Sequence, residues 1–119
     1  MTSIGVDIIE IERVESVIKR WGERFLNRIY TETELRICQD KLASLASRFA
    51  AKEAVMKVLG TGGIGISWRE IEILTGDYGK PSVKLYGQAL NKAEKLNLKE
   101  VSVSLSDSKQ HAVAVAIGA

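Results

Sequence analysis

Alternating hydrophobic and polar residues predict five short strands. Over residues 3–9, Ile4, Val6 and Ile8 share one face of a strand, and Gly5, Asp7 and Ile9 share the other. Residues 70–75 and 82–86 alternate in the same way, and the turn residues 76–81 between them predict a hairpin. Residues 101–106 and 112–117 form the last pair. The final strand is apolar on both faces, so we expect it to be central in a sheet or covered by another subunit.

Helical spacing of apolar residues predicts the remaining elements. Residues 10–20 and 23–29 are two helices interrupted at Trp21 and Gly22, Thr31 and Glu34 form a capping box that opens a short helix, and residues 88–96 form the last helix. The longest helix begins at Leu42 and ends at Gly60. This order predicts an α+β fold in which an antiparallel sheet packs against a long central helix, with residues 1–119 as a single domain.

Glu53 occupies an unusual place in the long helix. Phe49 precedes it by four residues and Met56 follows it by three, so the carboxylate shares a stripe with two large apolar side chains. A carboxylate in apolar surroundings must be neutralised, paired or given a cation. Lys57, four residues on, is one candidate partner, and a helix-surface ion pair between Glu53 and Lys57 is the alternative that assigns them no function.

Asp7 is a second carboxylate in an unexpected place, because it lies in an apolar strand beside Gly5, which leaves room for a close approach to the backbone. Two such carboxylates indicate a hard cation with oxygen ligands, and magnesium completed by water and substrate phosphates fits them best. His111 and Cys38 are the only histidine and cysteine, so one chain cannot supply a tetrahedral zinc site.

Four arginines, Arg13, Arg20, Arg24 and Arg28, follow one another at spacings of 7, 4 and 4 residues. On a straight helix they would form one basic stripe able to dock an acidic protein. A solvated face interleaved with glutamates is the alternative. Nucleic acid would also fit such a stripe, but the formal net charge is only +2, with 17 basic and 15 acidic residues, and no nucleic-acid motif is present.

The chain shows no long apolar segment that would span a membrane and no secretory leader, and its single cysteine fits a reducing compartment. We therefore expect a cytoplasmic protein.

Taken together, these residues resemble holo-acyl-carrier-protein synthase, the short bacterial type of 4'-phosphopantetheinyl transferase. Residues 5–13 (GVDIIEIER) are similar to the family's N-terminal motif, residues 48–60 to its central motif, and Gly79-Lys80-Pro81 to its third, while the strands over residues 101–117 are similar to its C-terminal ending. Asp107 departs from the pattern, since many members carry histidine there.

The resemblance implies transfer of the phosphopantetheine arm of coenzyme A to a serine of an acidic acyl carrier protein, releasing adenosine 3',5'-bisphosphate. It implies that Asp7 and Glu53 hold magnesium, that Lys57 lies beside the pyrophosphate, and that Arg13 belongs to the carrier-docking helix. It also implies a homotrimer with active sites between subunits. Coenzyme A would then contact these residues: Arg48, Lys57, Gly60, Gly62, Gly79, Lys80 and Pro81.

The sequence does not identify the group that accepts the serine proton; a metal-bound water positioned by Asp7 or Glu53 is our hypothesis. A non-catalytic module that holds an acidic protein on its basic helices is the rival function. It accounts for the arginines but leaves Asp7 and Glu53 unexplained.

Overall fold

The computed structural model describes residues 2–60, 62 and 64–119; Thr61 and Gly63 of the glycine-rich loop lie outside the described residues. The elements follow one another as β1 (Ser3–Glu10), α1 (Ile11–Trp21), α2 (Glu23–Ile29), α3 (Glu32–Cys38), α4 (Leu42–Leu59), β2 (Ile71–Thr75), β3 (Pro81–Leu85), α5 (Gly87–Lys95), β4 (Val101–Asp107) and β5 (His111–Gly118). Short 3-10 turns at Trp68–Glu70 and Asp77–Gly79 precede β2 and β3. The predicted α+β architecture is confirmed.

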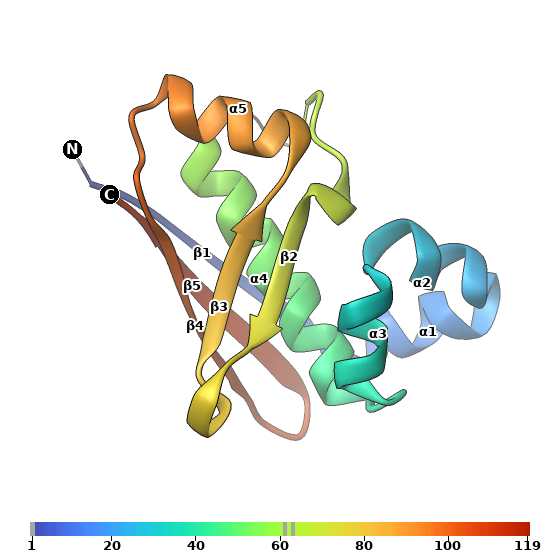
Figure 1. Cartoon of the computed structure of the whole chain (residues 1–119). Helices are drawn as coiled ribbons and strands as arrows, with labels where there is room; N and C mark the ends of the chain where they lie inside the picture. The colour runs from blue at the N-terminus through green and yellow to red at the C-terminus, as the bar shows by residue number, and fades with distance from the viewer. Residues whose placement is uncertain (1, 61, 63) are drawn as a thin grey trace.

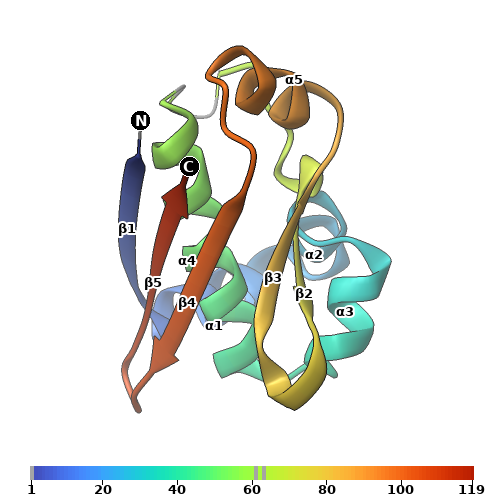
Figure 2. The same cartoon turned by 60° about the vertical axis from the view of Figure 1, so that its left-hand side comes forward.

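The strands form two antiparallel sheets, one in the order β1-β5-β4 and the other a β2-β3 hairpin (Figure 2). The central position expected for the last strand is confirmed, because β5 pairs with β1 on one side and β4 on the other. Its small residues, Ala112, Ala114 and Ala116, are fully buried, whereas the branched residues between them lie on the opposite face. The two faces of β5 therefore have different neighbours.

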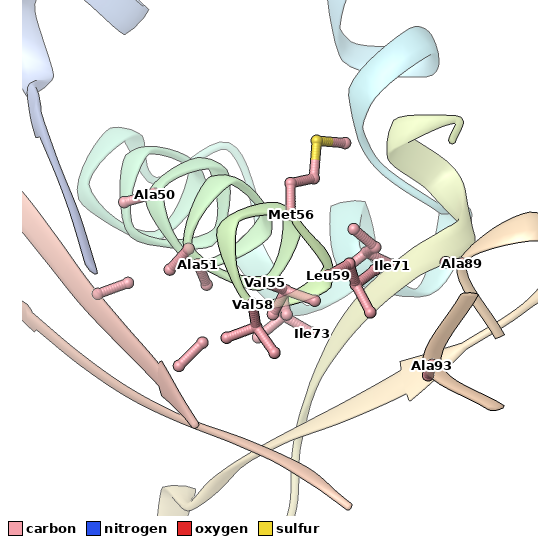
Figure 3. Packing of buried hydrophobic residues seen from close by; sticks show 13 residues of the cluster. Ala50, Ala51, Val55, Met56, Val58, Leu59, Ile71, Ile73, Ala89 and Ala93 are labelled. Carbon is pink, nitrogen blue, oxygen red and sulfur yellow. The ribbon is translucent and has the colours of Figure 1, made fainter. Parts of the chain in front are cut away.

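Helix α4 lies between the two sheets and contacts elements from both (Figure 1). Twelve of its residues are buried, so it has no continuous polar face. Val55 and Leu59 pack beside Ile71 and Ile73 of β2, on the side of the helix away from the three-stranded sheet (Figure 3). Gly60 ends the helix with a positive φ of 73°, as predicted.

Strand β1 approaches α4 backbone to backbone at Gly5. A Cβ added at Gly5 would collide with the carbonyl oxygen of Ala54 and would lie 3.0 Å from Cβ of Lys57. The space that the sequence predicted beside Gly5 is thus filled by α4. Small residues on both surfaces, Ala54 on the helix and Ala114 and Ala116 on the neighbouring strand, permit this close packing.

A buried ion pair joins α3 to α4. Lys52 Nζ lies 2.7 Å from Glu34 Oε1, and both side chains are inaccessible to solvent. Lys52 also donates to the carbonyl oxygens of Trp68 and Ile71, while Glu34 Oε2 accepts a hydrogen bond from the backbone N–H of Ile73. Every Lys52 hydrogen therefore has an acceptor, which is the condition for burying such a pair.

Burial departs from the simple sequence pattern at two places. Glu72 alternates with the apolar residues of β2, yet it is buried, and its carboxylate accepts hydrogen bonds from Thr31 Oγ1 and the Tyr86 hydroxyl. Leu90 of α5 and Leu96, which directly follows α5, are exposed, whereas Ala89 and Ala93 pack into the core.

Along the described ranges, no helix combines the length and the apolarity needed to cross a lipid bilayer.

The close contact at Gly5 can be tested by Gly5→Ala. The new methyl group has no room against the Ala54 carbonyl, so β1 and α4 must separate, and we expect the free energy of unfolding in denaturant titrations to fall by about 1–3 kcal/mol. Gly76→Ala is the matched control, since its Cβ would lie 3.5 Å from the nearest atom, the Lys80 carbonyl oxygen. It should change stability by less than about 0.5 kcal/mol. Equal effects of the two substitutions would refute the close packing.

Candidate active site

The three residues predicted to act together, Asp7, Glu53 and Lys57, converge where β1 crosses α4. Lys57 Nζ donates to the carbonyl oxygen of Val6 at 2.7 Å and to Oδ1 of Asp7 at 3.2 Å. Within the described chain, Lys57 forms an ion pair with Asp7 rather than with Glu53. The simple helix-surface pair between Glu53 and Lys57 is therefore wrong, because β1 supplies the carboxylate from the other end of the sequence.

Glu53 is the member of this group whose pKa is shifted by its surroundings. Burial, followed by the negative charge of Asp7 and a hydrogen bond with it, raises the pKa of Glu53 from 4.5 to about 7. Lys57 and Arg13 act in the opposite direction, lowering the pKa without cancelling the rise. Near neutral pH the Glu53 carboxyl is therefore protonated part of the time.

Asp7 and Glu53 together suit a divalent cation, which would replace the proton on Glu53 and relieve the repulsion between two ionised carboxylates. In the described parts of the chain, no group of three or more histidine, cysteine, aspartate or glutamate side chains is arranged to hold a metal. Among the residues searched, Asp7 and Glu53 are thus two carboxylates without a closed cage around them. Magnesium takes such a donor set when water and substrate phosphates complete its coordination.

Glu53 separates two hollows of similar size. The first, about 410 Å³, which we call the α1 hollow, is lined by Asp7, Arg13, Val17 and Phe25 among others. The second, about 420 Å³, which we call the loop hollow, is lined by Met56, Lys57, Gly62, Ile66 and Trp68. Because Glu53 lines both, groups bound on its two sides would meet at the carboxylate pair.

The four arginines do not form the single stripe expected of a straight helix. The chain turns sharply at Gly22, where φ is 57° and ψ is −133°, and α2 runs beside α1 (Figure 1). All four are exposed. Arg13 lies on the wall of the α1 hollow with Asp7, whereas Arg20 and Arg24 gather around Trp21 at the far end of α1.

The residues predicted to contact coenzyme A are divided among three places. Gly60 ends α4 and Gly62 lines the loop hollow with Lys57. Lys80 and Pro81, beside Gly79 at the β2-β3 turn, line a separate groove of about 740 Å³ between β3 and β4. Arg48 is buried, donating to the Ile73 carbonyl at 3.2 Å and to Thr75 Oγ1 at 2.6 Å. In the part of the chain that the structure describes, neither Arg48 nor the β2-β3 turn lines the loop hollow.

Sequence reasoning missed Trp68 and Ile66. Trp68 stacks on Phe49 with ring centroids 5.0 Å apart and lines the loop hollow together with Lys57. The available signal was a large aromatic residue directly after a glycine-rich loop. It was missed because no apolar periodicity surrounds it.

Comparison with known proteins gives one consistent result. Residues 3–116 match the family described as the 4'-phosphopantetheinyl transferase superfamily. The chain is 53% identical over 117 residues to a holo-[acyl-carrier-protein] synthase of Dehalococcoides mccartyi, covering 98% of each sequence.

Two solved structures are similar over nearly the whole chain. Helicobacter pylori holo-[acyl-carrier-protein] synthase in complex with coenzyme A has a TM-score of 0.87 and 35% identity, covering 98% of this chain and 99% of that one. The Bacillus anthracis holo-(acyl-carrier-protein) synthase in complex with CoA (3',5'-ADP) has a TM-score of 0.78 and 34% identity, with coverage of 98% and 94%.

The raised pKa of Glu53 predicts how stability changes with pH. Between about pH 4.5 and about pH 7 the folded protein binds more protons at Glu53 than the unfolded chain does, so the free energy of unfolding should fall as pH rises. Urea titrations in the absence of divalent cations should show this fall in the wild type but not in Glu53→Gln. Glu94→Gln, on exposed α5, is the control and should retain it. Parallel curves for wild type and Glu53→Gln would contradict the assignment.

Proposed function

This chain belongs to the 4'-phosphopantetheinyl transferase superfamily and is a holo-[acyl-carrier-protein] synthase, and we propose that it transfers the phosphopantetheine arm of coenzyme A to a serine of an acidic apo acyl carrier protein in a magnesium-dependent reaction. The observation that carries the proposal is the convergence of Asp7, Glu53 and Lys57 between β1 and α4.

In the proposed reaction the serine hydroxyl attacks the phosphorus that carries the pantetheine. A new bond forms between the serine oxygen and that phosphorus, and the bond from the phosphorus to the oxygen shared with the adenosine phosphate breaks. Adenosine 3',5'-bisphosphate leaves and the serine proton is released. The ligand of the similar Bacillus anthracis enzyme, CoA (3',5'-ADP), supports this product.

Lys57 is placed to bind the pyrophosphate and has an N–H donor left to do so. Two of its three N–H groups are directed to Val6 and Asp7, its side chain is half exposed, and it lines the loop hollow with Gly62. The third N–H can therefore donate to a phosphate oxygen and stabilise negative charge as the leaving group departs. When bound by Asp7 and Glu53, Mg²⁺ supplies further neutralisation of the pyrophosphate charge.

We propose that each substrate occupies one of the two hollows. In this proposal the loop hollow, which Lys57 lines, takes the pyrophosphate, and the α1 hollow, with Arg13 on its wall, admits the carrier serine. Arg13, Arg20, Arg24 and Arg28 are exposed, and in the residues described none of them forms an ion pair with a carboxylate. They remain free to attract an acidic carrier, and carrier binding should weaken as salt increases.

We propose a homotrimer in which a neighbour's Gly79-Lys80-Pro81 turn completes the coenzyme site. The support is a row of exposed apolar residues on the outward face of β1, where Ile4, Val6 and Ile8 are 69%, 54% and 65% exposed. Ile117 of β5 is paired opposite Ile4 and extends the row. An apolar row of this size is a typical subunit interface. Coenzyme contact by Arg48 stays a prediction that the buried position in one protomer does not support.

A cytoplasmic location also stays a prediction, and the buried free thiol of Cys38 is its support.

The test of function is the intact mass of an apo acyl carrier protein incubated with this protein, coenzyme A and magnesium, beside a reaction with chelator. We expect a metal-dependent gain of one phosphopantetheine and release of adenosine 3',5'-bisphosphate. Glu53→Gln and Lys57→Met should lower kcat/KM by at least about 100-fold, while Glu94→Gln should match the wild type. A folded wild type that leaves a competent carrier unmodified would refute the proposal and favour the binding module.

Light scattering tests the assembly. The wild type should have three times the mass of one chain, and Val6→Lys should lower the mass by placing charges in the apolar row. Leu96→Lys makes an equally drastic change at an exposed residue directly after α5, so it is the control and should retain the wild-type mass. A wild-type mass of one chain would overturn the trimer.

A further inference from the structure

Trp21 is a large apolar side chain that the fold leaves in solvent. It is the last residue of α1, directly before the sharp turn at Gly22, and it is 50% exposed. It belongs to none of the three clusters of buried hydrophobic residues that hold the described fold together. An exposed tryptophan that contributes little to the core is typical of a contact surface.

Two guanidiniums flank this indole. The Arg20 Cζ lies 5.3 Å and the Arg24 Cζ 5.9 Å from the centre of the Trp21 ring. Arg20 precedes Trp21 on α1 and Arg24 follows it on α2, so the turn at Gly22 places both arginines around one ring. A guanidinium held against an aromatic ring keeps its N–H edge free for carboxylates and loses less side-chain freedom on binding.

We propose that Trp21 helps to bind the acidic carrier in two ways. Its ring positions Arg20 and Arg24 to bind carboxylates of the carrier, and it contacts an apolar side chain that lies between those carboxylates. This inference rests on the proposed function, because it takes an acyl carrier protein as the partner. Charge complementarity favours this occupant, since the arginines form no ion pairs across the described residues. Tryptophan and arginine at the centre of an interface are also the residues that most often dominate binding.

The position of Trp21 indicates a role in binding the carrier and not in the transfer step itself. Arg13 lines the α1 hollow beside Asp7 and Glu53, whereas Trp21 does not line that hollow. Loss of the indole should therefore weaken capture of the carrier and leave the bound reaction unchanged.

Steady-state kinetics of Trp21→Ala separate these effects. We expect the KM for the carrier to rise about tenfold or more, with kcat at saturating carrier and the KM for coenzyme A unchanged. Trp21→Phe keeps an aromatic face and should recover most of the loss, whereas Trp21→Leu keeps only apolar surface and should recover little. Leu96→Ala removes a similarly exposed apolar side chain directly after α5 and should resemble the wild type. An unchanged carrier KM in Trp21→Ala would overturn the proposal.

A double-mutant cycle tests whether Trp21 acts through Arg24. If the ring holds the guanidinium, Arg24→Gln should cost much less in the Trp21→Ala background than in the wild type. Effects that multiply would show that the two residues act independently and would overturn the positioning role.

Calorimetric titration of apo carrier into wild type and Trp21→Ala keeps this test separate from the test of function. A wild type that binds carrier through Trp21 without transferring phosphopantetheine would refute the proposed function and support this inference. Transfer with equal carrier affinity in both proteins would support the function and refute the inference, and a wild type that does not bind carrier would also refute it.

Discussion

The close approach of β1 to α4 is the constraint on which the site depends. Where Gly5 faces Ala54, the two backbones are separated by no side chain, so their distance is fixed by main-chain atoms. Two residues along the strand, the same approach brings the Asp7 carboxyl to Glu53 and Lys57. Backbone contacts of this kind are stiff compared with contacts between long side chains, and they hold two carboxyls together although their charges repel.

The opposite side of α4 is fixed by a different interaction. Lys52 is paired with Glu34 and bonded to the carbonyls that lead into β2, so the rotation of the helix about its axis is set from within the core. Consecutive residues on a helix point about 100° apart, and burying Lys52 therefore directs Glu53 away from β2 and toward the hollows. A buried ion pair adds little net stability, but it penalises any arrangement that leaves one partner alone.

The sequence predicted the carboxylate pair because both members break a local pattern. Asp7 is a poor strand residue and Glu53 interrupts an apolar stripe, and each needed a compensating partner. Burial of Lys52, Arg48 and Glu72 could not be predicted, because their partners lie 14 to 41 residues away and only the fold brings them together. Helix α4 also has no polar face, so periodicity gave no sign of which charged residues point inward.

The alternation of β1 has a consequence for changes in its length. Val6 points to the exposed apolar row, whereas Asp7, the next residue, points to Glu53 and Lys57. Alternate positions of one strand therefore face two different surfaces. Inserting or deleting a single residue between Ser3 and Asp7 would exchange the faces of everything on one side of the change. The apolar row and the candidate active site would be damaged by the same event. A change in the length of this segment should therefore be more damaging than most single substitutions in it, because it alters both surfaces at once.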